Sequence, residues 1–194
     1  MAITIKSERE IELMTQAGRI LEIVHEEMEK ALKPGMTTLD IDAIGEEVIR
    51  SYGCEPSFLN YNGYPASICV SVNEEVVHGI PSRNRIIQEG DIVSLDAGLI
   101  YKGYHSDAAR THAVGEISEE AKKLIEVTRQ SFFEGIKYAK EGNYLFEISG
   151  AIGRYAAGFG YGVVRELCGH GIGTHLHEDP EIPNFPMMRR GPKL

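Results

Sequence analysis

Apolar residues recur every three to four positions along the first fifty residues, which is the period of an α-helix with one buried face. Ser7 followed by Glu10 forms a capping-box pattern, which predicts a helix that ends at the Pro-Gly pair 34–35. A second helix is expected from Thr38 to just before Gly53. The apolar stripes of these helices are Ile11, Met14, Ala17, Leu21, Val24, Met28 and Leu32, and then Ile41, Ile44, Val48 and Ile49.

The pattern then changes to that of β-strands, at residues 67–72 and again between Asp91 and Thr111. Within the second stretch, Lys102-Gly103 is suited to a two-residue turn, so we predict a β-hairpin around it. Counting outward from this turn fixes which residues face each other, because side chains alternate between the two faces of a strand.

The predicted register places two aspartates on one face of the hairpin, with Asp96 opposite Ala109 and Asp107 opposite Gly98. The two carboxylates become diagonal neighbours, about 7 Å apart at the backbone. Aspartate is disfavoured inside strands, and two facing carboxylates repel each other and are costly to bury unpaired. A divalent cation would remove both problems, whereas the alternative is that each aspartate caps a turn or faces solvent. We therefore treat the pair as candidate metal ligands.

A third helix is expected from Ser118 to about Ala139, after which the order of elements repeats. Residues 33–35, a short helix and Gly53 recur as residues 140–142, a short helix and Gly160, at a constant offset of 107 residues. An internal duplication explains this order, although chance is a competitor because the identities are few. The offset would place a second hairpin from about residue 198. We therefore expect the chain to end one hairpin short, with an exposed sheet edge.

Composition narrows the functional classes. The 194 residues are 42% hydrophobic and 25% charged, as in a soluble globular protein, and the net charge of −9 argues against specific nucleic-acid binding. No apolar run reaches the roughly 18 residues that a membrane span requires, and residues 1–6 lack the apolar core of a signal peptide, so we expect a cytoplasmic protein without membrane association. Cys54, Cys69 and Cys168 are widely spaced and are expected to be reduced thiols.

The histidines add nitrogen donors. His170 lies in the glycine-rich segment 169–173, after a predicted apolar strand at 161–167, and is the best candidate for a nitrogen ligand. A phosphate-binding loop and a hydrogen-bonded core histidine are the alternatives. His78, on a predicted exposed loop, would orient substrate or donate a proton, and His177 offers a second imidazole. Of the other histidines, His25 is expected to be structural, His105 to lie on the face of the aspartates, and His112 to lie at a strand end.

Oxygen-rich ligands with one imidazole suit Mn, Fe, Co or Zn and, less decisively, Mg. The helix motif H-E-x-x-H of zinc proteases and the G-x-S-x-G motif of serine hydrolases do not occur. Together the features resemble type I methionine aminopeptidase over essentially the whole chain. The segments that carry the resemblance are Asn60-Tyr61-Asn62-Gly63-Tyr64-Pro65, Ser71-Val72-Asn73-Glu74, Val77-His78-Gly79-Ile80-Pro81, Gly90-Asp91-Ile92-Val93-Ser94-Leu95-Asp96, Asp107, and Gly169-His170-Gly171-Ile172-Gly173.

The resemblance implies an α/β (α+β) fold of the pita-bread type, a single catalytic domain over residues 1–194 with halves of about 1–115 and 116–194. It implies two divalent metal ions, Co, Mn, Fe or Zn, held by Asp96, Asp107 and His170, with Asp107 bridging. It also implies catalytic substrate contacts from His78 and His177, the latter helping to hold the tetrahedral intermediate. The implied pocket for the methionine side chain comprises Phe58, Tyr61, Tyr64, Cys69 and Leu176.

The implied reaction is hydrolysis of the first peptide bond of nascent polypeptides that begin with methionine and have a small second residue. Members of the family carry two further glutamate ligands on the second hairpin, so we expect metal occupancy and activity to be impaired in these 194 residues. The alternatives are a non-catalytic member of the fold that binds peptides or partners, and a related metal-dependent proline-peptide hydrolase. A monomer is expected, with oligomerisation through the exposed sheet edge as the alternative; ribosome association is left open.

Overall fold

The computed structural model describes residues 3–194, which divide into two compact units. The first unit comprises residues 4–118 and 172–177, and the second comprises residue 3 together with residues 119–171 and 178–194. Among the residues described, no helix is long and apolar enough to cross a membrane.

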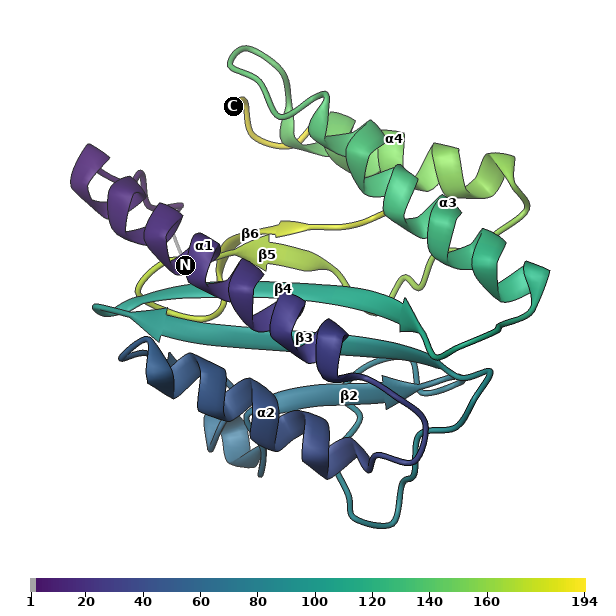
Figure 1. The fold of residues 1–194 in the computed structure, drawn as a ribbon. Helices are drawn as coiled ribbons and strands as arrows, with labels where there is room; N and C mark the ends of the chain where they lie inside the picture. The colour runs from purple at the N-terminus through teal and green to yellow at the C-terminus, as the bar shows by residue number, and fades with distance from the viewer. Residues whose placement is uncertain (1–2) are drawn as a thin grey trace. The chain divides into compact units, whose positions relative to one another are not determined.

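The two predicted helices of the first unit are confirmed. Helix α1 spans Glu8–Ala31 and helix α2 spans Thr38–Ser51. Each begins with a complete capping box, in which Ser7 and Thr37 are the N-cap residues, so the first backbone donors of both helices have acceptors. Gly53, predicted to follow the second helix, has a φ of 68°, which glycine adopts without strain. Both helices lie on the same face of the sheet (Figure 1).

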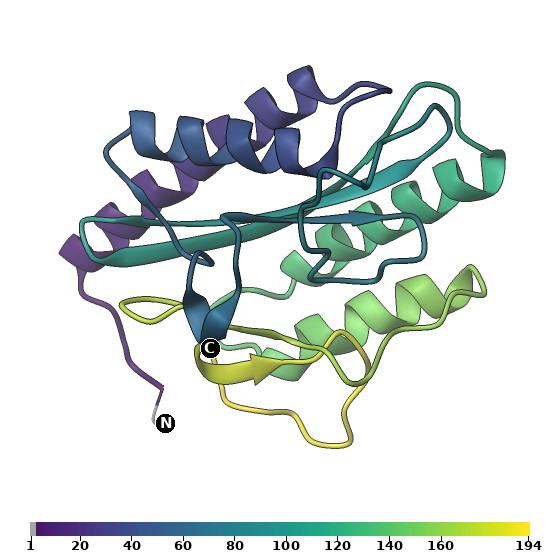
Figure 2. The ribbon, with the colours of Figure 1, turned by 90° about the horizontal axis from the view of Figure 1, so that it is seen from below.

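The sheet of the first unit is antiparallel, with β3 (Ile92–Tyr101) at its centre. On one side β3 pairs with β1 (Glu55–Pro56) and β2 (Ile68–Val72), and on the other side with β4 (Tyr104–Ala113). A short 3₁₀ turn, η1 (Tyr61–Gly63), lies between β1 and β2 in the chain. Figure 2 shows α1 and α2 together on one side of these strands.

The predicted hairpin is confirmed residue by residue. Asp96 pairs with Ala109 and Gly98 pairs with Asp107, outward from a two-residue turn at Lys102-Gly103. Both turn residues have positive φ, 49° and 87°, as a tight hairpin turn of this kind requires. The turn therefore sets the register that brings the two aspartates to one face.

The core of the first unit lies between the helices and the sheet. His25, on α1, is fully buried there, and its Nε2 donates a hydrogen bond to the carbonyl oxygen of Ala108 at 2.9 Å, which confirms a structural role for this residue. The largest fully buried apolar side chains are Met28, Ile41, Ile49, Ile68, Ile87, Leu95 and Leu99. Ile11, placed on the apolar stripe of the first helix, is 54% exposed, because it lies in the first turns of α1 away from this core.

The second unit contains α3 (Glu119–Ile136), α4 (Leu145–Gly158), β5 (Gly169–Gly171) and β6 (Glu178–Ile182). Helices α3 and α4 pack closely at Gly135, where an added Cβ would lie 2.5 Å from Ile152 Cγ1. β5 and β6 form an antiparallel pair. The third helix was thus predicted correctly; it begins one residue and ends about three residues inside the expected bounds.

The predicted strand at 161–167 is wrong. These residues have no regular secondary structure, and the strand begins only at Gly169. Val164 and Leu167 are 47% and 39% exposed, so the apolar run neither enters a core nor pairs with a neighbouring strand in the described structure. An apolar run becomes a strand only where a partner supplies the ladder of hydrogen bonds.

The offset of 107 residues recurs in the structure. Adding 107 to the bounds of α2, 38–51, gives 145–158, the bounds of α4. The isolated bridge between Thr37 and Ile86 recurs at the same offset between Tyr144 and Lys193. These matches agree with an internal duplication, whereas the division into halves at 115 and 116 stays a prediction.

Candidate active site

The two hairpin aspartates form a close, half-buried carboxyl pair. Asp96 and Asp107 project from β3 and β4 on the same face, and a hydrogen bond joins their carboxyl groups. Burial raises the pKa of Asp96 well above its usual range, and the negative charge of Asp107 raises it further. The pair therefore resists full ionisation in the absence of a positive charge.

This donor pair fits a divalent metal ion. A cation would neutralise both carboxylates and replace the proton that they share. Within residues 4–118 and 172–177, all of which the structure describes, no third His, Cys, Asp or Glu joins the pair to form a three-donor group. The pair therefore supplies two of the three ligands predicted from the sequence.

His170 lies on β5 of the second unit, where it pairs with Glu181 of β6. Its Nδ1 is 2.8 Å from the carbonyl oxygen of Gly171, and because a carbonyl oxygen only accepts, Nδ1 carries the proton. In the neutral ring the lone pair is then on Nε2. This is the tautomer in which histidine commonly binds a metal ion through one nitrogen while donating from the other. Its role as a ligand stays a prediction.

Most of the predicted pocket residues form one apolar cluster, separate from the main core. Phe58, Cys69 and Leu176 are buried together, and Tyr64 packs against them. Cys69 is the cross-strand neighbour of Asp96, so the cluster lies directly beside the carboxyl pair. Ile172, from the glycine-rich segment, also packs here, although the sequence did not single it out.

The space for this cluster depends on a glycine in β3. A Cβ added at Gly98 would lie 2.7 Å from the ring atom Cε1 of Phe58 and 3.0 Å from Ser57 Cβ. Gly98 is also the cross-strand partner of Asp107. Because Gly98 has no side chain, the ring of Phe58 can pack against β3 at the position that pairs with Asp107.

The thiol in the pocket is buried, and its environment disfavours ionisation. Burial raises the pKa of Cys69 to about 11, and the charges of Asp96 and Asp107 act in the same direction. Burial also raises the pKa of Tyr64. Both groups stay protonated at neutral pH, so this part of the pocket is an uncharged surface with polarisable sulfur, suited to an apolar side chain.

His177 and Tyr61 form a pair at the exposed rim. The Tyr61 hydroxyl is 2.9 Å from His177 Nδ1, and the ring centroids are 5.5 Å apart. The segment 172–177 is fixed to the hairpin by a hydrogen bond from the His105 backbone N–H to the carbonyl oxygen of Gly173, at 2.8 Å. An exposed imidazole is thus held in a defined orientation next to the apolar cluster.

His78 lies on the loop between β2 and β3, exposed as predicted. Its backbone has a φ of 58°, in the left-handed region that few residues other than glycine adopt. Gly79, which follows it, lies so close to β2 that an added Cβ would be 2.3 Å from the carbonyl oxygen of Val70. The loop is therefore anchored immediately beside the histidine.

Two polar contacts around the pocket were missed. Asp42 of α2 is buried and accepts backbone hydrogen bonds from the start of β2, and Ser57 Oγ is 2.9 Å from Nδ1 of His105. A signal for Asp42 exists, since it lies on the buried face of its helix with Thr38 and Ile49. The pairing of Ser57 with His105, 48 residues apart, has no local signal.

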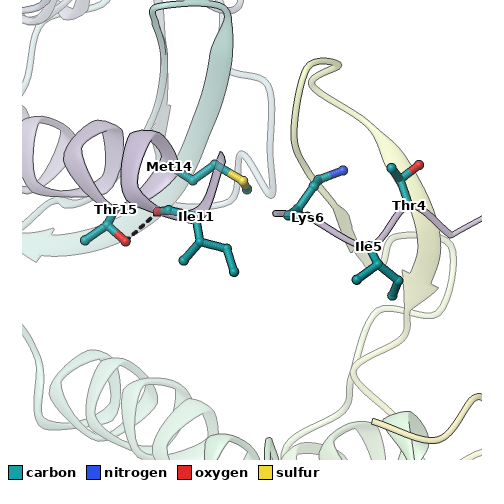
Figure 3. Close-up of a pocket in the computed structure, with 6 residues that line it drawn as sticks. All are labelled: Thr4, Ile5, Lys6, Ile11, Met14 and Thr15. Atoms are coloured by element: carbon teal, nitrogen blue, oxygen red, sulfur yellow. Dashed lines mark hydrogen bonds between the residues drawn. The ribbon is translucent and has the colours of Figure 1, made fainter. Parts of the chain in front are cut away.

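A surface hollow of about 540 Å³ lies at the N-terminal end of the first unit (Figure 3). It is lined by Thr4, Ile5, Lys6, Ile11, Met14 and Thr15. None of these side chains is a carboxylate, thiol or imidazole, and none belongs to the carboxyl pair or the apolar cluster. The hollow is therefore not the candidate active site, which lies at the carboxyl pair.

Residues 12–194 match metallopeptidase family M24. A methionine aminopeptidase of Clostridium acetobutylicum is 57% identical over 192 residues, which are 99% of this chain and 77% of the relative. A crystal structure of methionine aminopeptidase from Thermotoga maritima matches with a TM-score of 0.96 at 41% identity, over 100% of this chain and 78% of that one. A Xaa-Pro dipeptidase from Bacillus anthracis matches with a TM-score of 0.80 at 30% identity, over 93% and 49%.

The likeness to the two aminopeptidases exceeds the likeness to the proline-specific enzyme in identity, and in TM-score for the aminopeptidase of known structure. The α/β fold is that of pita-bread enzymes of both kinds. The high identity decides between them, and the chain belongs to the methionine aminopeptidases of metallopeptidase family M24.

Proposed function

We propose that this chain removes the N-terminal methionine from nascent polypeptides whose second residue is small, with divalent metal ions held by Asp96, Asp107 and His170. The observation that carries the proposal is the position of the half-buried carboxyl pair directly beside a buried apolar cluster. An aminopeptidase needs these two features together, because the scissile bond is formed by the carbonyl carbon of the same residue whose side chain is recognised.

The apolar cluster suits the side chain of methionine. Phe58, Cys69 and Leu176 supply aromatic, sulfur and aliphatic contacts, which are favourable for a flexible thioether. The raised pKa of Cys69 keeps the thiol uncharged, so that no ionised group competes for the pocket. A charged first residue would lose its hydration here without gaining a partner.

The protein groups around the carboxyl pair have distinct proposed roles. When bound, the metal ions would polarise the carbonyl group and activate water. His177, oriented by Tyr61, would donate a hydrogen bond to the carbonyl oxygen as negative charge develops on it. His78 would hold the substrate backbone from the opposite loop. The carboxylate and imidazole donors are compatible with Co, Mn, Fe or Zn.

The experiment is the release of methionine from the peptide Met-Ala-Ser by chelator-treated protein to which Mn²⁺, Co²⁺, Fe²⁺ or Zn²⁺ is added in turn. We expect release that requires a metal and falls strongly when alanine is replaced by phenylalanine in the peptide. Asp96→Asn should lower the rate at least about 100-fold, since a lost ligand costs no less than a lost supporting contact.

Ser94→Ala is the matched control. Ser94 is on the same face of β3, two residues from Asp96, and its hydroxyl is 2.7 Å from that of Thr111 across the strands. This variant removes a cross-strand polar contact without removing a carboxylate, so the rate should be nearly unchanged. Equal rates for the Asp96→Asn variant and the unaltered protein would contradict the proposed ligand set, and release with no metal dependence would contradict the mechanism.

A further inference from the structure

Asp42 is a charged residue buried where α2 meets β2. Only 7% of its surface is exposed, and burial raises the pKa of its carboxyl group. It lies on the buried face of α2, near Gly45, which packs so tightly against β2 that an added Cβ would be 2.6 Å from Ile68 Cγ1. A buried carboxylate lowers the stability of the fold unless hydrogen bonds compensate for its lost hydration, so the partners of Asp42 indicate its role.

The Asp42 carboxylate holds the entry to β2. Its Oδ1 accepts the backbone N–H groups of Ser67 and Ile68, at 2.9 and 2.8 Å. One turn further along α2, Glu46 Oε2 accepts the hydroxyl of Ser67 at 2.8 Å. Cys69, which follows Ile68 in the chain, forms part of the pocket wall and pairs with Asp96. The helix therefore fixes the start of the strand that carries this wall.

The Tyr64 hydroxyl connects β2 with the loop of His78. It is 3.1 Å from the carbonyl oxygen of Ile68 and 3.1 Å from that of Gly79. A hydroxyl has a single proton, so Tyr64 shares it between the strand and the loop. The same tyrosine packs against the pocket cluster.

Gly79 is held from three sides. Its N–H donates to Ser71 Oγ at 3.0 Å, and its carbonyl oxygen accepts from the Val70 N–H at 2.9 Å as well as from Tyr64. His78 precedes it with a left-handed backbone, a conformation that persists only where neighbouring contacts maintain it. The position of His78 therefore depends on the bonds made by the following residue.

We propose that Asp42 is a positioning residue, which acts through the start of β2 and the Tyr64 hydroxyl to hold the methionine pocket and the His78 loop in register. The carboxylate touches neither substrate nor metal in this scheme. The inference rests on the proposed function, since it concerns the pocket and His78 named there. A purely structural role for Asp42 would instead stabilise the fold without affecting either.

The test compares variants of the whole chain. Asp42→Leu removes the acceptor at similar size, Asp42→Asn retains an acceptor oxygen, and Tyr64→Phe removes only the hydroxyl. For each we would measure kcat and KM for Met-Ala-Ser, the thermal midpoint, and the imidazole NMR signal of His78. Asp40→Ala is the control, because Asp40 caps the same helix through Thr37, whereas Asp42 and Glu46 bind the start of β2.

We expect Asp42→Leu and Tyr64→Phe each to raise KM about tenfold and to move the His78 signal, since small displacements of positioning groups have large effects. The two together should cost little more than either alone, because they interrupt one chain of contacts. Asp42→Asn should behave almost as the unaltered protein. Asp40→Ala should lower only the thermal midpoint, through loss of the cap.

A lowered thermal midpoint in Asp42→Leu with KM and the His78 signal unchanged would overturn the inference, as would additive effects of the two substitutions. Failure of the proposed function would look different. In that case the unaltered protein would release no methionine with any metal. The His78 signal would still report whether loss of the Asp42 acceptor displaces the loop, so it would still test the inference.

Discussion

His25 and Asp42 of the first unit are buried and Asp96 is half-buried, and the surroundings of each differ. Asp42 is satisfied by backbone donors, His25 donates to a carbonyl oxygen, and Asp96 faces a second carboxyl group. Burial raises the pKa of both carboxyl groups, so their ionisation at neutral pH opposes folding, but two backbone N–H donors offset this cost at Asp42. The carboxyl group that faces a second carboxyl group is the one assigned to chemistry.

Protonation of His25 should make the free energy of unfolding fall at acidic pH. Burial lowers its pKa from 6.5 to about 4, and the charge of Arg110, the nearby His112 and Glu29 on its own helix modify this shift. The lowered pKa means that the unfolded chain takes up the proton first. The stabilising contribution is therefore complete above pH 6.5 and is lost as the pH falls towards 4, by roughly 3 kcal/mol in total.

His25→Gln keeps a donor for Ala108 but does not titrate, so its free energy of unfolding should fall less steeply between pH 7 and pH 4.5. Urea denaturation across this range measures the difference. His175→Gln, at an exposed position, is the control and should follow the unaltered protein. Parallel curves for both variants would contradict the assignment, although His112, whose pKa burial also lowers, should leave some acid sensitivity in each.

At the scale of elements, the hairpin was predictable to the residue and the segment 161–167 was not. The hairpin carries its own register, because a Lys-Gly turn and alternating side chains are local information. The apolar run at 161–167 shows the same local preference for a strand, but no neighbouring strand pairs with it in the described structure. The predicted strand at 67–72 did form as β2, because β3 supplies its ladder, so a local preference for a strand is realised only where a partner strand is present.

Packing between α2 and β2 should be tested with a pair of glycines. Gly45→Ala would place a Cβ within 3.0 Å of Ile68 and Met28, which should cost about 1–3 kcal/mol and exceed the gain in helix propensity. Gly158→Ala, at the end of α4, has no neighbour within 4 Å. It should gain up to about 1 kcal/mol. Denaturant midpoints of the two variants should move in opposite directions; a stabilised Gly45→Ala would mean that the interface is not tight.

At the scale of the whole molecule, the sequence located the candidate site better than it explained the site's construction. The aspartate pair followed from register, and the pocket residues followed from a family resemblance rather than from any pattern that brings residues 58, 69 and 176 together. The burial of Asp42 could be read from the period of its helix, but its bonds to the start of β2 and the packing of Ile172 were missed, because these contacts join residues distant in the chain. Long-range contacts of this kind leave almost no periodic signal.

The same molecule-wide view predicts opposite effects of metal on two forms of the protein. Without metal, the pKa of Asp96 is higher in the folded protein than in the unfolded chain. The free energy of unfolding is therefore highest below the unfolded pKa, near 3.9, and falls as the pH rises through the pKa of the folded protein. Asp96→Asn removes this penalty and should raise the metal-free thermal midpoint, by an amount corresponding to at least about 1 kcal/mol at pH 7.5.

Added metal should make the unaltered protein more stable than the Asp96→Asn variant. The unaltered protein gains about 2.7 kcal/mol when the metal concentration is 100 times its dissociation constant, whereas a variant that does not bind gains nothing. Thermal midpoints measured in chelator and in excess Mn²⁺ would test both halves, with Ser94→Ala expected to follow the unaltered protein throughout. If Asp96→Asn proved less stable in chelator, the carboxyl pair would be a stabilising contact of the fold rather than two ligands held together at the expense of stability. If the variant gained as much from Mn²⁺ as the unaltered protein, Asp96 would not be a ligand, and the metal would have to be sought at other donors.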